Sequence, residues 1–369
     1  MPALRLMDVM KRFGRLEAID SVTFEVRDGE YLCILGPTGS GKTTLLRMLA
    51  GILQPDEGEI FMGDRLVNGV SAEDRDAVYV PQTYALFPHM TVLGNVMFGP
   101  VARGSSASAA QEAAMRVLKV VRLDQRADAY PNELSGGMQQ RVALARGLAS
   151  GAKLLLLDEP LGALDARLRL DLRSYLRGLA KESGLTVVHV THDQEEAMAL
   201  GDRILVLRRG RVQQHGTPFH IYNGPESIFV AHFVGNSNFL EGVVAQRNRT
   251  ESSIRLRQGL GLRVSNTSHE PEEAVIASFR ESEARIHPAS RGSNGISLKG
   301  VVAAVRFLGG SARYEVRLSN GDALAVRVPL NGTRRTIKSG DHVRVSIDPN
   351  KIAVYDYPPL GLQRELEAY

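Results

Sequence analysis

The strongest chemical pattern in this sequence is a glycine-rich turn that ends in lysine and threonine. The stretch "GPTGSGKTT" spaces Gly36, Gly41, Lys42 and Thr43 as G-x-x-x-x-G-K-S/T, directly after the apolar run "YLCIL". Such a turn lets backbone N–H groups and a helix N-terminus surround phosphate oxygens. Lys42 would reach the β- and γ-phosphates of ATP, and Thr43 would bind Mg²⁺. The predicted phosphate-binding residues are Gly36, Pro37, Thr38, Gly39, Ser40, Gly41, Lys42, Thr43 and Thr44.

Two carboxylates end a second apolar run. In "KLLLLDEP" the run stops at Asp158 and Glu159, which are therefore expected at the carboxyl edge of a parallel sheet, where nucleotides bind. Asp158 would hold Mg²⁺ through water, and Glu159 would orient or deprotonate the attacking water. An acidic cap of a following helix is the weaker alternative, because a phosphate-binding turn precedes this strand in the same chain.

Two further patterns gain meaning only from these neighbours. The buried strand predicted in "LTVVHVTHDQEEA" delivers His192 to its carboxyl end, although a lone histidine there is more often structural. The stretch "LSGGMQQR" places a Ser-Gly-Gly turn at the start of a predicted helix, where free N–H groups form an anion site. On the C-terminal side of this turn, the predicted helix "QQRVALARGLAS" offers no lysine or carboxylate for chemistry, so the anion must come from elsewhere.

Six motifs in this order resemble those of the ATP-binding subunits of ABC transporters. They are "GPTGSGKTT", "VPQTYALFPHMTV", "LSGGMQQR", "LLLLDEP", "LGALD" and "VTHDQEEA", and together they cover about the first 235 residues. The resemblance implies that two copies pair head to tail, so that Ser135, Gly136 and Gly137 face the γ-phosphate held by the partner's P-loop. It further implies that Glu159 is the general base and His192 a γ-phosphate sensor.

Three more residues take roles from the resemblance. Gln82 would be a ligand of Mg²⁺ and water, and it begins the segment "TYALFPHMT", which would contact membrane subunits; a packed loop beneath a helical subdomain explains that segment equally well. Asp165 in "LGALD" would cross the dimer, and it also suits a helix N-cap; both interpretations can hold. Phe13 stands where the family often has a tyrosine stacked on adenine, so stacking is expected with looser base selectivity.

These motifs require a particular set of elements to position them. Strand, turn and helix alternate around the P-loop, which predicts an α/β P-loop NTPase core over residues 1–235. Between Gln82 and the signature motif, "VARGSSASAAQEAAMRVLKVVRLDQ" changes from small polar residues to an apolar-periodic helix. A helical subdomain is therefore expected at about 84–152.

The remaining residues, 236–369, have a different sequence pattern, made of short β-rich runs. Eight short β-rich runs predict an all-β domain that resembles the OB-like (TOBE) barrels appended to importer ATPases. The peptide Gly242-Val243-Val244-Ala245 recurs as Gly300-Val301-Val302-Ala303, a faint internal repeat. These runs lack interleaved aromatic and basic residues, so we expect dimerisation and regulation rather than nucleic-acid binding. "RIHPASRG" stands where many relatives have Arg-Pro-Glu, which puts a regulatory contact through that stretch in doubt.

Composition limits the class of protein. The net charge of +4 in 369 residues is too small for a dedicated nucleic-acid binder, and Cys33 is the only cysteine, so no internal disulfide can form. No apolar run approaches the length of a membrane span, and charges interrupt the N-terminal stretch where a secretory signal would be apolar. We expect a peripheral protein on the cytoplasmic face of the inner membrane.

The sequence thus predicts an ATPase that energises solute import as a homodimer, with ATP and Mg²⁺ as cofactors. Its partners would be itself, two membrane permease subunits and, indirectly, a solute-binding protein. The stretches "YALFPHMTVLGNV" and "GNSNFLEG" favour polyamine, ferric-ion or phosphonate-type solutes. The alternatives are a sugar importer ATPase and an ABC ATPase without a transport role, which usually has long coiled coils or tandem cores.

Overall fold

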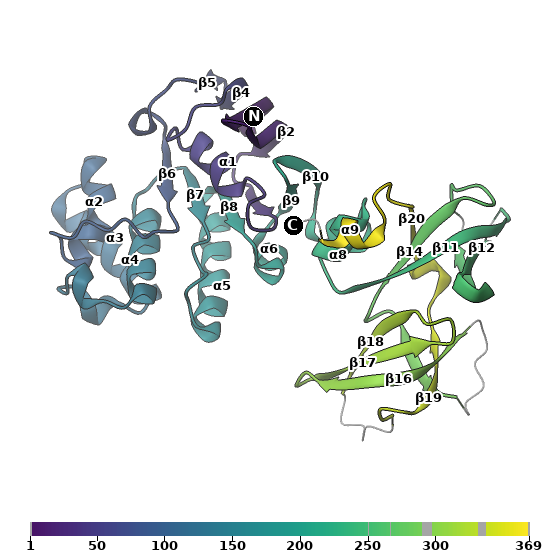
Figure 1. Ribbon diagram of the computed structural model, residues 1–369. Coiled ribbons are helices and arrows are strands. Elements are labelled where there is room, and N and C mark those ends of the chain that lie inside the picture. The colour runs from purple at the N-terminus through teal and green to yellow at the C-terminus, as the bar shows by residue number, and fades with distance from the viewer. Residues whose placement is uncertain (1, 250, 266, 290–296, 331–336, 368–369) are drawn as a thin grey trace. The chain divides into compact units, whose positions relative to one another are not determined.

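The computed structural model describes residues 2–249, 251–265, 267–289, 297–330 and 337–367 (Figure 1). The chain forms two compact units, the first ending at Gly224 and the second beginning at Pro225. The first combines helices with two sheets and the second is mainly β, so the predicted fold class of a P-loop core followed by an OB-like domain is confirmed.

A six-stranded, mostly parallel sheet forms the centre of the first unit. Its strand order is β10-β9-β3-β8-β7-β6, and β10 is the only antiparallel member among these strands. Every residue of β3, β7 and β8 is buried, which explains why these strands are almost continuously apolar. The strands are β3 (Tyr31–Leu35), β6 (Ala77–Val80), β7 (Leu154–Asp158), β8 (Thr186–Thr191), β9 (Arg203–Arg208) and β10 (Arg211–Gly216).

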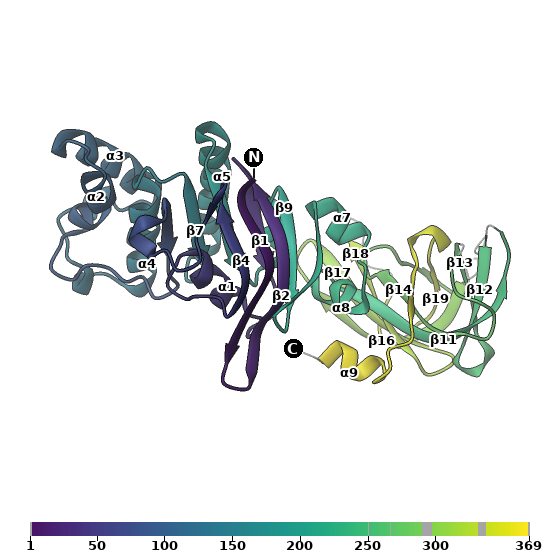
Figure 2. The same ribbon diagram turned by 90° about the horizontal axis from the view of Figure 1, so that it is seen from above.

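Helix α1 (Lys42–Leu49) lies between this sheet and an antiparallel one (Figures 1 and 2). The antiparallel sheet has the order β2-β1-β4-β5 and one buried face. Leu45, Leu46, Met48 and Leu49 of α1 belong to the same core cluster as residues of both sheets. The P-loop helix is therefore fixed on two sides. The strands are β1 (Pro2–Phe13), β2 (Leu16–Arg27), β4 (Glu57–Met62) and β5 (Arg65–Leu66).

Helices α2, α3 and α4 pack on one another as the helical subdomain that the sequence predicts. Each begins at a side-chain cap, because Thr91, Ser106 and Ser135 accept hydrogen bonds from backbone N–H groups three residues later. On the face of the central sheet away from α1 lie α5 and α6. The helices are α2 (Val92–Ala102), α3 (Ala107–Val120), α4 (Gly136–Ala149), α5 (Ala166–Ser183), α6 (Gln194–Leu200) and α7 (Pro218–Asn223).

Two five-stranded antiparallel sheets share one core in the second unit. Their strand orders are β13-β12-β11-β14-β20 and β15-β19-β16-β17-β18, and residues of both enter a single hydrophobic cluster. The strands are β11 (Ser237–Arg247), β12 (Glu251–Leu256), β13 (Gly261–Ser265), β14 (Ala274–Arg280), β15 (Arg285–Pro288), β16 (Ser297–Phe307), β17 (Ser311–Leu318), β18 (Ala323–Pro329), β19 (His342–Ser346) and β20 (Ala353–Asp356). The helices are α8 (Ile228–Phe233) and α9 (Leu362–Glu367).

The weak sequence repeat corresponds to a structural one. Gly242 lies opposite Leu256 and Val275, and Gly300 lies opposite Leu318 and Val343, so each glycine holds the same place between two partner strands. All eight predicted β-rich runs form strands. The sequence did not predict β13 and β15, which are only five and four residues long.

Short 3₁₀ helices complete the description. They are η1 (Ala72–Asp74), η2 (Asp124–Arg126), η3 (Pro131–Glu133), η4 (Arg257–Gly259) and η5 (Pro349–Lys351).

The division of the chain yields a first prediction. Fragments 1–224 and 1–235 should both bind Mg·ATP with dissociation constants within about threefold of the full chain, because the P-loop and both carboxylates precede Gly224. The longer fragment should be less soluble. It retains α8, whose Ala231 carbonyl accepts hydrogen bonds from Ser237 and Arg280 of the second unit, and leaves the apolar side chains of that helix uncovered.

Circular dichroism and nucleotide titration of both fragments check this prediction. A fragment that is folded and soluble but does not bind nucleotide would show that the ATP site needs residues beyond the first unit.

Candidate active site

The strand order of the central sheet brings the predicted catalytic residues together. β3, β8, β7 and β6 are parallel neighbours, so the segments that follow them meet at one edge of the sheet. A cavity of about 740 Å³ opens at this edge. The described residues that line it are Phe13, Leu16, Glu17, Ala18, Thr38, Gly39, Gly41, Lys42, Thr43, Thr44, Gln82, Glu159, His192 and Arg209.

The turn before α1 has the shape of a phosphate cradle. Gly41 has a φ of +102°, and a Cβ there would lie 2.4 Å from the Ala18 carbonyl oxygen. Lys42 Nζ donates to the carbonyl oxygens of Gly36 and Pro37, both at 2.8 Å, and burial lowers the pKa of this amine. The buried Ser40 hydroxyl has no hydrogen-bond partner among the described residues. Free N–H groups, a cation and an unpaired hydroxyl fit a bound phosphate.

Asp158 and Thr43 form the oxygen-rich part of the site. Thr43 Oγ1 donates to Asp158 Oδ1 at 3.0 Å, and Tyr79 Oη donates to Asp158 Oδ2 at 3.1 Å. Burial raises the pKa of the Asp158 carboxyl, while both hydroxyls oppose that shift by stabilising the anion. Two hard oxygen donors beside a phosphate cradle fit Mg²⁺, which takes few protein ligands and several phosphate or water oxygens.

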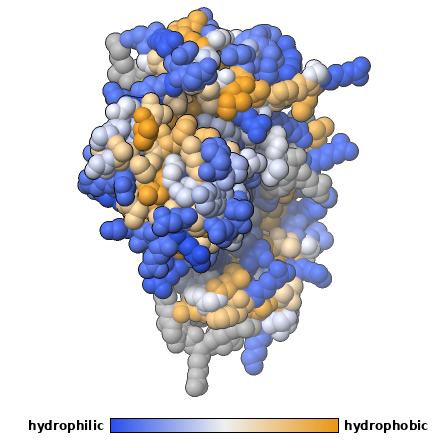
Figure 3. All heavy atoms as spheres, turned by 90° about the vertical axis from the view of Figure 1, so that its left-hand side faces the viewer, coloured by the Kyte–Doolittle hydropathy of each residue, from blue (hydrophilic) through white to orange (hydrophobic). Residues whose placement is uncertain are grey.

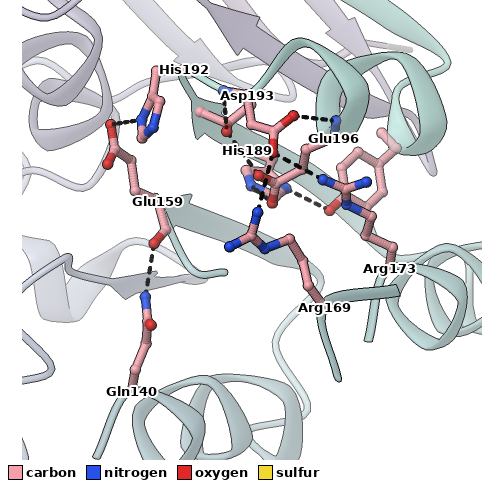
Figure 4. Close-up of polar contacts among 10 residues, drawn as sticks. Gln140, Glu159, Arg169, Arg173, His189, His192, Asp193 and Glu196 are labelled. Atoms are coloured by element: carbon pink, nitrogen blue, oxygen red, sulfur yellow. Dashed lines mark hydrogen bonds and ion pairs between the residues drawn. The ribbon is translucent and has the colours of Figure 1, made fainter. Parts of the chain in front are cut away.

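Glu159 turns the chain sharply at the end of β7. Its φ of +48° is unusual for a residue with a side chain and is held from two directions. Its N–H donates to the Val190 carbonyl of β8 at 2.9 Å, and its own carbonyl accepts from Gln140 Nε2 of α4 at 2.9 Å. The carboxylate then lies 3.2 Å from Gln82 Nε2 and 3.0 Å from His192 Nδ1. Three predicted site residues therefore meet at this carboxylate (Figure 4 shows Glu159, His192 and Gln140).

The whole chain is similar to known importer ATPases. A spermidine/putrescine import ATP-binding protein of Pseudomonas aeruginosa is 41% identical over 350 residues, covering 94% of this chain and 96% of the relative. A sulfate/thiosulfate import ATP-binding protein of Rhizobium meliloti is 40% identical over 352 residues, covering 94% and 92%. Residues 19–162 match the ABC transporter family and residues 271–354 the TOBE domain.

The chain belongs to the ATP-binding subunits of ABC importers. It is an ABC-type ATPase, and the resemblance drawn from the six sequence motifs is confirmed. The ATP-binding cassette MJ0796, solved as a dimer in a post-hydrolysis state bound to ADP and Pi, agrees at 34% identity with a TM-score of 0.55. That comparison covers 58% of this chain and 98% of the cassette.

The signature motif of this ABC ATPase is separate from the chain's own cavity. Ser135 caps α4 by accepting from Met138 N, and Gly136 and Gly137 form the first turn. None of these three is among the described residues that line the cavity. Asp165 is absent from that lining as well; it caps α5 by accepting from Leu168 N at 2.9 Å.

Gln140 connects the signature helix to the catalytic strand. Its amide donates to the Glu159 carbonyl, and its Oε1 accepts from Ala163 N at 3.0 Å. Only about 6% of the residue is exposed. Gln140 and Tyr79 are not among the site residues predicted from the sequence. The sequence did contain clues to both residues. Gln140 lies one helical turn after Gly136 and Gly137 in "LSGGMQQR". Tyr79 lies three residues before Gln82, on strand β6, which pairs with β7.

Phe13 lines the cavity with a largely exposed ring. The side chain is 47% exposed, and Lys11 Nζ lies 5.6 Å from the ring centroid. Arg209, which the sequence analysis did not select, also lines this cavity. An exposed aromatic face beside the P-loop is compatible with the predicted stacking on adenine.

His192 belongs to a loop that charged side chains hold in place (Figure 4). The next residue, Asp193, accepts from Glu196 N through Oδ1 and from Arg173 Nη2 through Oδ2, both at 3.0 Å. Arg169 Nη1 lies 3.6 Å from the same carboxylate, and Arg169 Nη2 donates to the Leu164 carbonyl at 2.9 Å. Asp193 thus ties the His192 loop to α5 and to the backbone beside Asp165.

A buried polar chain continues from this loop to β3. Thr191 Oγ1 donates to Glu196 Oε2 at 2.9 Å, and His189 Nε2 lies 3.1 Å from Glu196 Oε1. Tyr31 Oη lies 2.8 Å from His189 Nδ1. Burial alone would raise the pKa of the Glu196 carboxyl, but His189 and Thr191 outweigh it and lower that pKa. The loop is therefore supported on the sheet side as well.

This support predicts a positioning role for Arg173. Arg173→Leu should lower the turnover number for ATP roughly ten- to a hundredfold, because His192 moves relative to Glu159 when Asp193 loses its nearest cation. The KM for ATP should stay within about threefold, since Arg173 is not among the described residues that line the cavity. Steady-state hydrolysis by the purified chain measures both constants.

Arg177→Leu is the matched control. Arg177 lies one turn further along α5 and pairs with Asp202, not with the His192 loop. Arg173→Lys should restore part of the turnover. Equal losses from the Leu variants at 173 and 177 would indicate a general loss of stability and contradict the positioning role.

Proposed function

We propose that this chain is the ATP-hydrolysing subunit of an ABC importer, acting as a homodimer that encloses two Mg·ATP. One observation supports this proposal best. The P-loop, Glu159, Gln82 and His192 surround one cavity, while Ser135, Gly136 and Gly137 of the signature motif are not among the described residues that line it. The N–H groups at the start of the signature helix can bind an anion. In a dimer, the γ-phosphate of the ATP bound to the second copy would be that anion.

The chain's own residues would divide the work of hydrolysis. Lys42 and the P-loop N–H groups would bind the β- and γ-phosphates. Glu159 would accept a proton from the attacking water while the water oxygen bonds to the γ-phosphorus. The bond between the γ-phosphorus and the β,γ-bridging oxygen then breaks, which gives ADP and phosphate. His192, already beside Glu159, would hold the γ-phosphate and this carboxylate in register. Thr43, Asp158 and Gln82 would hold Mg²⁺, which supplies charge neutralisation at the phosphates.

Several features support contact across a dimer. MJ0796 was solved as a dimer, and the structural match to it covers 58% of this chain. Ser135 and Gly137 would contact the partner's γ-phosphate, Gly136 would add an N–H group, and Asp165 would cross the interface near the partner's catalytic groups. Phe13 would stack on adenine in its own subunit. We also propose that residues 236–369 add dimer contacts and regulation.

The helical subdomain offers a surface for a membrane partner. A small cavity there is lined by Phe87, Phe98, Gly99 and Arg146 among others, and Phe98 is 44% exposed. Arg146 lies 5.0 Å from the centroid of the Phe87 ring. Figure 3 shows hydrophobic side chains gathered among hydrophilic ones on the face that carries α2, α3 and α4. We propose that permease subunits dock here and hold the protein at the cytoplasmic face of the inner membrane.

None of the described helices is both long enough and apolar enough to span a bilayer. The transported solute is proposed from the relatives: spermidine/putrescine importers are among the most similar proteins, and a sulfate/thiosulfate importer is nearly as similar. We propose a polyamine as the solute, with an oxyanion as the alternative that the second relative favours.

Glu159→Gln tests the catalytic assignment and the dimer together. The variant should bind Mg·ATP with affinity near that of the wild type, because the P-loop and Asp158 are unchanged, but its hydrolysis should fall roughly a hundredfold or more, since an amide cannot accept the proton. Trapped ATP should make the variant sediment as a stable dimer with ATP and dissociate toward monomer with ADP. Sedimentation and nucleotide affinity measure both effects.

Adding Gly137→Asp to this variant should abolish the ATP-locked dimer while ATP still binds to the intact P-loop. The matched control is Gly137→Ala in the same background. A Cβ at this position would lie 3.1 Å from the Ala163 carbonyl oxygen, so the alanine reproduces the crowding without the charge. If the aspartate variant still locks with ATP, the signature motif does not face a phosphate in the partner.

Transport measurements test the solute. Cells that lack this chain should lose uptake of radiolabelled putrescine or spermidine, and wild-type chain but not Glu159→Gln should restore it. Normal polyamine uptake with lost sulfate uptake would replace the polyamine with the oxyanion. Unchanged uptake of both, by a chain that still hydrolyses ATP, would favour a sugar importer or a non-transport ABC ATPase.

A further inference from the structure

A further cavity lies in the second unit, and it shares no lining residue with the cavity of the ATP site. It encloses about 450 Å³ on the outer face of β19, β16 and β17. The described residues that line it are Ala289, Lys299, Gly300, Val301, Arg317, Leu318, Ser319, His342, Val343 and Arg344. Four of these are basic or can become so, and none is acidic.

The strand register places the basic side chains around one point. Lys299 lies opposite Arg344 on the neighbouring strand, and Val301, two residues further along β16, lies opposite both His342 and Arg317. Residues two apart share a face, so all four basic side chains project from the same side of the sheet. The two rows are separated by about 7 Å along the strand. The basic groups thus surround Val301 on this face of the sheet.

These cations have no counter-charge in the described structure. Lys299, Arg317 and Arg344 form no ion pair with any carboxylate among the described residues. Some arginines of the same unit do pair with glutamates, namely Arg247, Arg255, Arg257, Arg306 and Arg313. Like charges directly opposite one another on adjacent strands are destabilising, so the pair Lys299 and Arg344 costs free energy unless an anion lies between them.

We propose that this cavity binds a small soluble molecule that carries phosphate groups. Guanidinium groups match phosphate oxygens in pairs, and a lysine adds a compact positive charge. The volume exceeds that of a single inorganic phosphate and falls within the range of sites for small molecules. No Phe, Tyr or Trp side chain is among the described lining residues, so a stacked nucleic-acid strand is disfavoured.

Binding of fructose 1,6-bisphosphate to the full chain tests this proposal. The chain is first saturated with Mg·ADP, so that the P-loop cannot take the probe, and calorimetry then measures the remaining binding. Wild-type chain should bind about one molecule per subunit, and unphosphorylated fructose should not bind. Lys299→Gln/Arg344→Gln should weaken the bisphosphate at least about tenfold, because two charge-assisted contacts are lost.

Arg249→Gln/Arg263→Gln is the matched control, since it removes two positive charges from the same unit outside the cavity lining. It should change the affinity by less than about twofold, and circular dichroism should match the wild type for both double variants. The proposal is overturned if wild-type chain shows no saturable binding, or if the control weakens the bisphosphate as much as the cavity variant does.

Two further probes distinguish other sources of phosphate. Phosphatidylglycerol vesicles and a single-stranded oligonucleotide should bind the cavity variant and the control variant equally. Selective loss of either interaction in the cavity variant, with the bisphosphate unaffected, would assign these residues to a lipid surface or a nucleic acid and overturn the small-molecule site.

Discussion

The catalytic site depends on how the chain turns at Glu159. A left-handed backbone at a residue with a side chain costs about 1–3 kcal/mol and persists only where the surroundings fix it. Here β8 accepts its N–H, and Gln140 of the signature helix donates to its carbonyl. The turn aims the carboxylate at Gln82 and His192 instead of back along the strand. A hydrogen bond from the signature helix therefore helps to set the direction of the proposed general base.

At this edge of the sheet, two aspartates connect the proposed nucleotide-binding residues to neighbouring segments of the chain. Asp158 joins the P-loop helix through Thr43 and joins β6 through Tyr79. Asp193 joins the His192 loop to α5 through Arg173, and Arg169 extends this link to the Leu164 backbone. The side chains of Asp193, Arg173 and Arg169 therefore connect the His192 loop to the segment that contains Asp165.

The second unit is held together by the apolar cluster between its two sheets. Its two sheets enclose one apolar cluster, and Gly242 and Gly300 occupy matching places in the central strand of each sheet. Charge is distributed unevenly over its surface. Arginines on strands other than β16, such as Arg247 and Arg255, form ion pairs with glutamates. Lys299, Arg317 and Arg344, in contrast, line one cavity that has no acidic residue in its described lining. This unit therefore carries the proposed phosphate site, which shares no lining residue with the ATP site.

The sequence by itself determined the chemistry, the family and most strands, because these depend on local patterns. The spacing of Gly36, Gly41 and Lys42 and the apolar runs before them already predict a phosphate cradle after a buried strand. Only the tertiary structure decided which groups meet. Gln140 and Glu159 are 19 residues apart, and Tyr79 and Asp158 are 79 apart, so their contacts follow from strand order and helix docking. The cavity on β16 has the same origin, since no local pattern shows that Lys299, Arg317 and Arg344 share one face of a sheet.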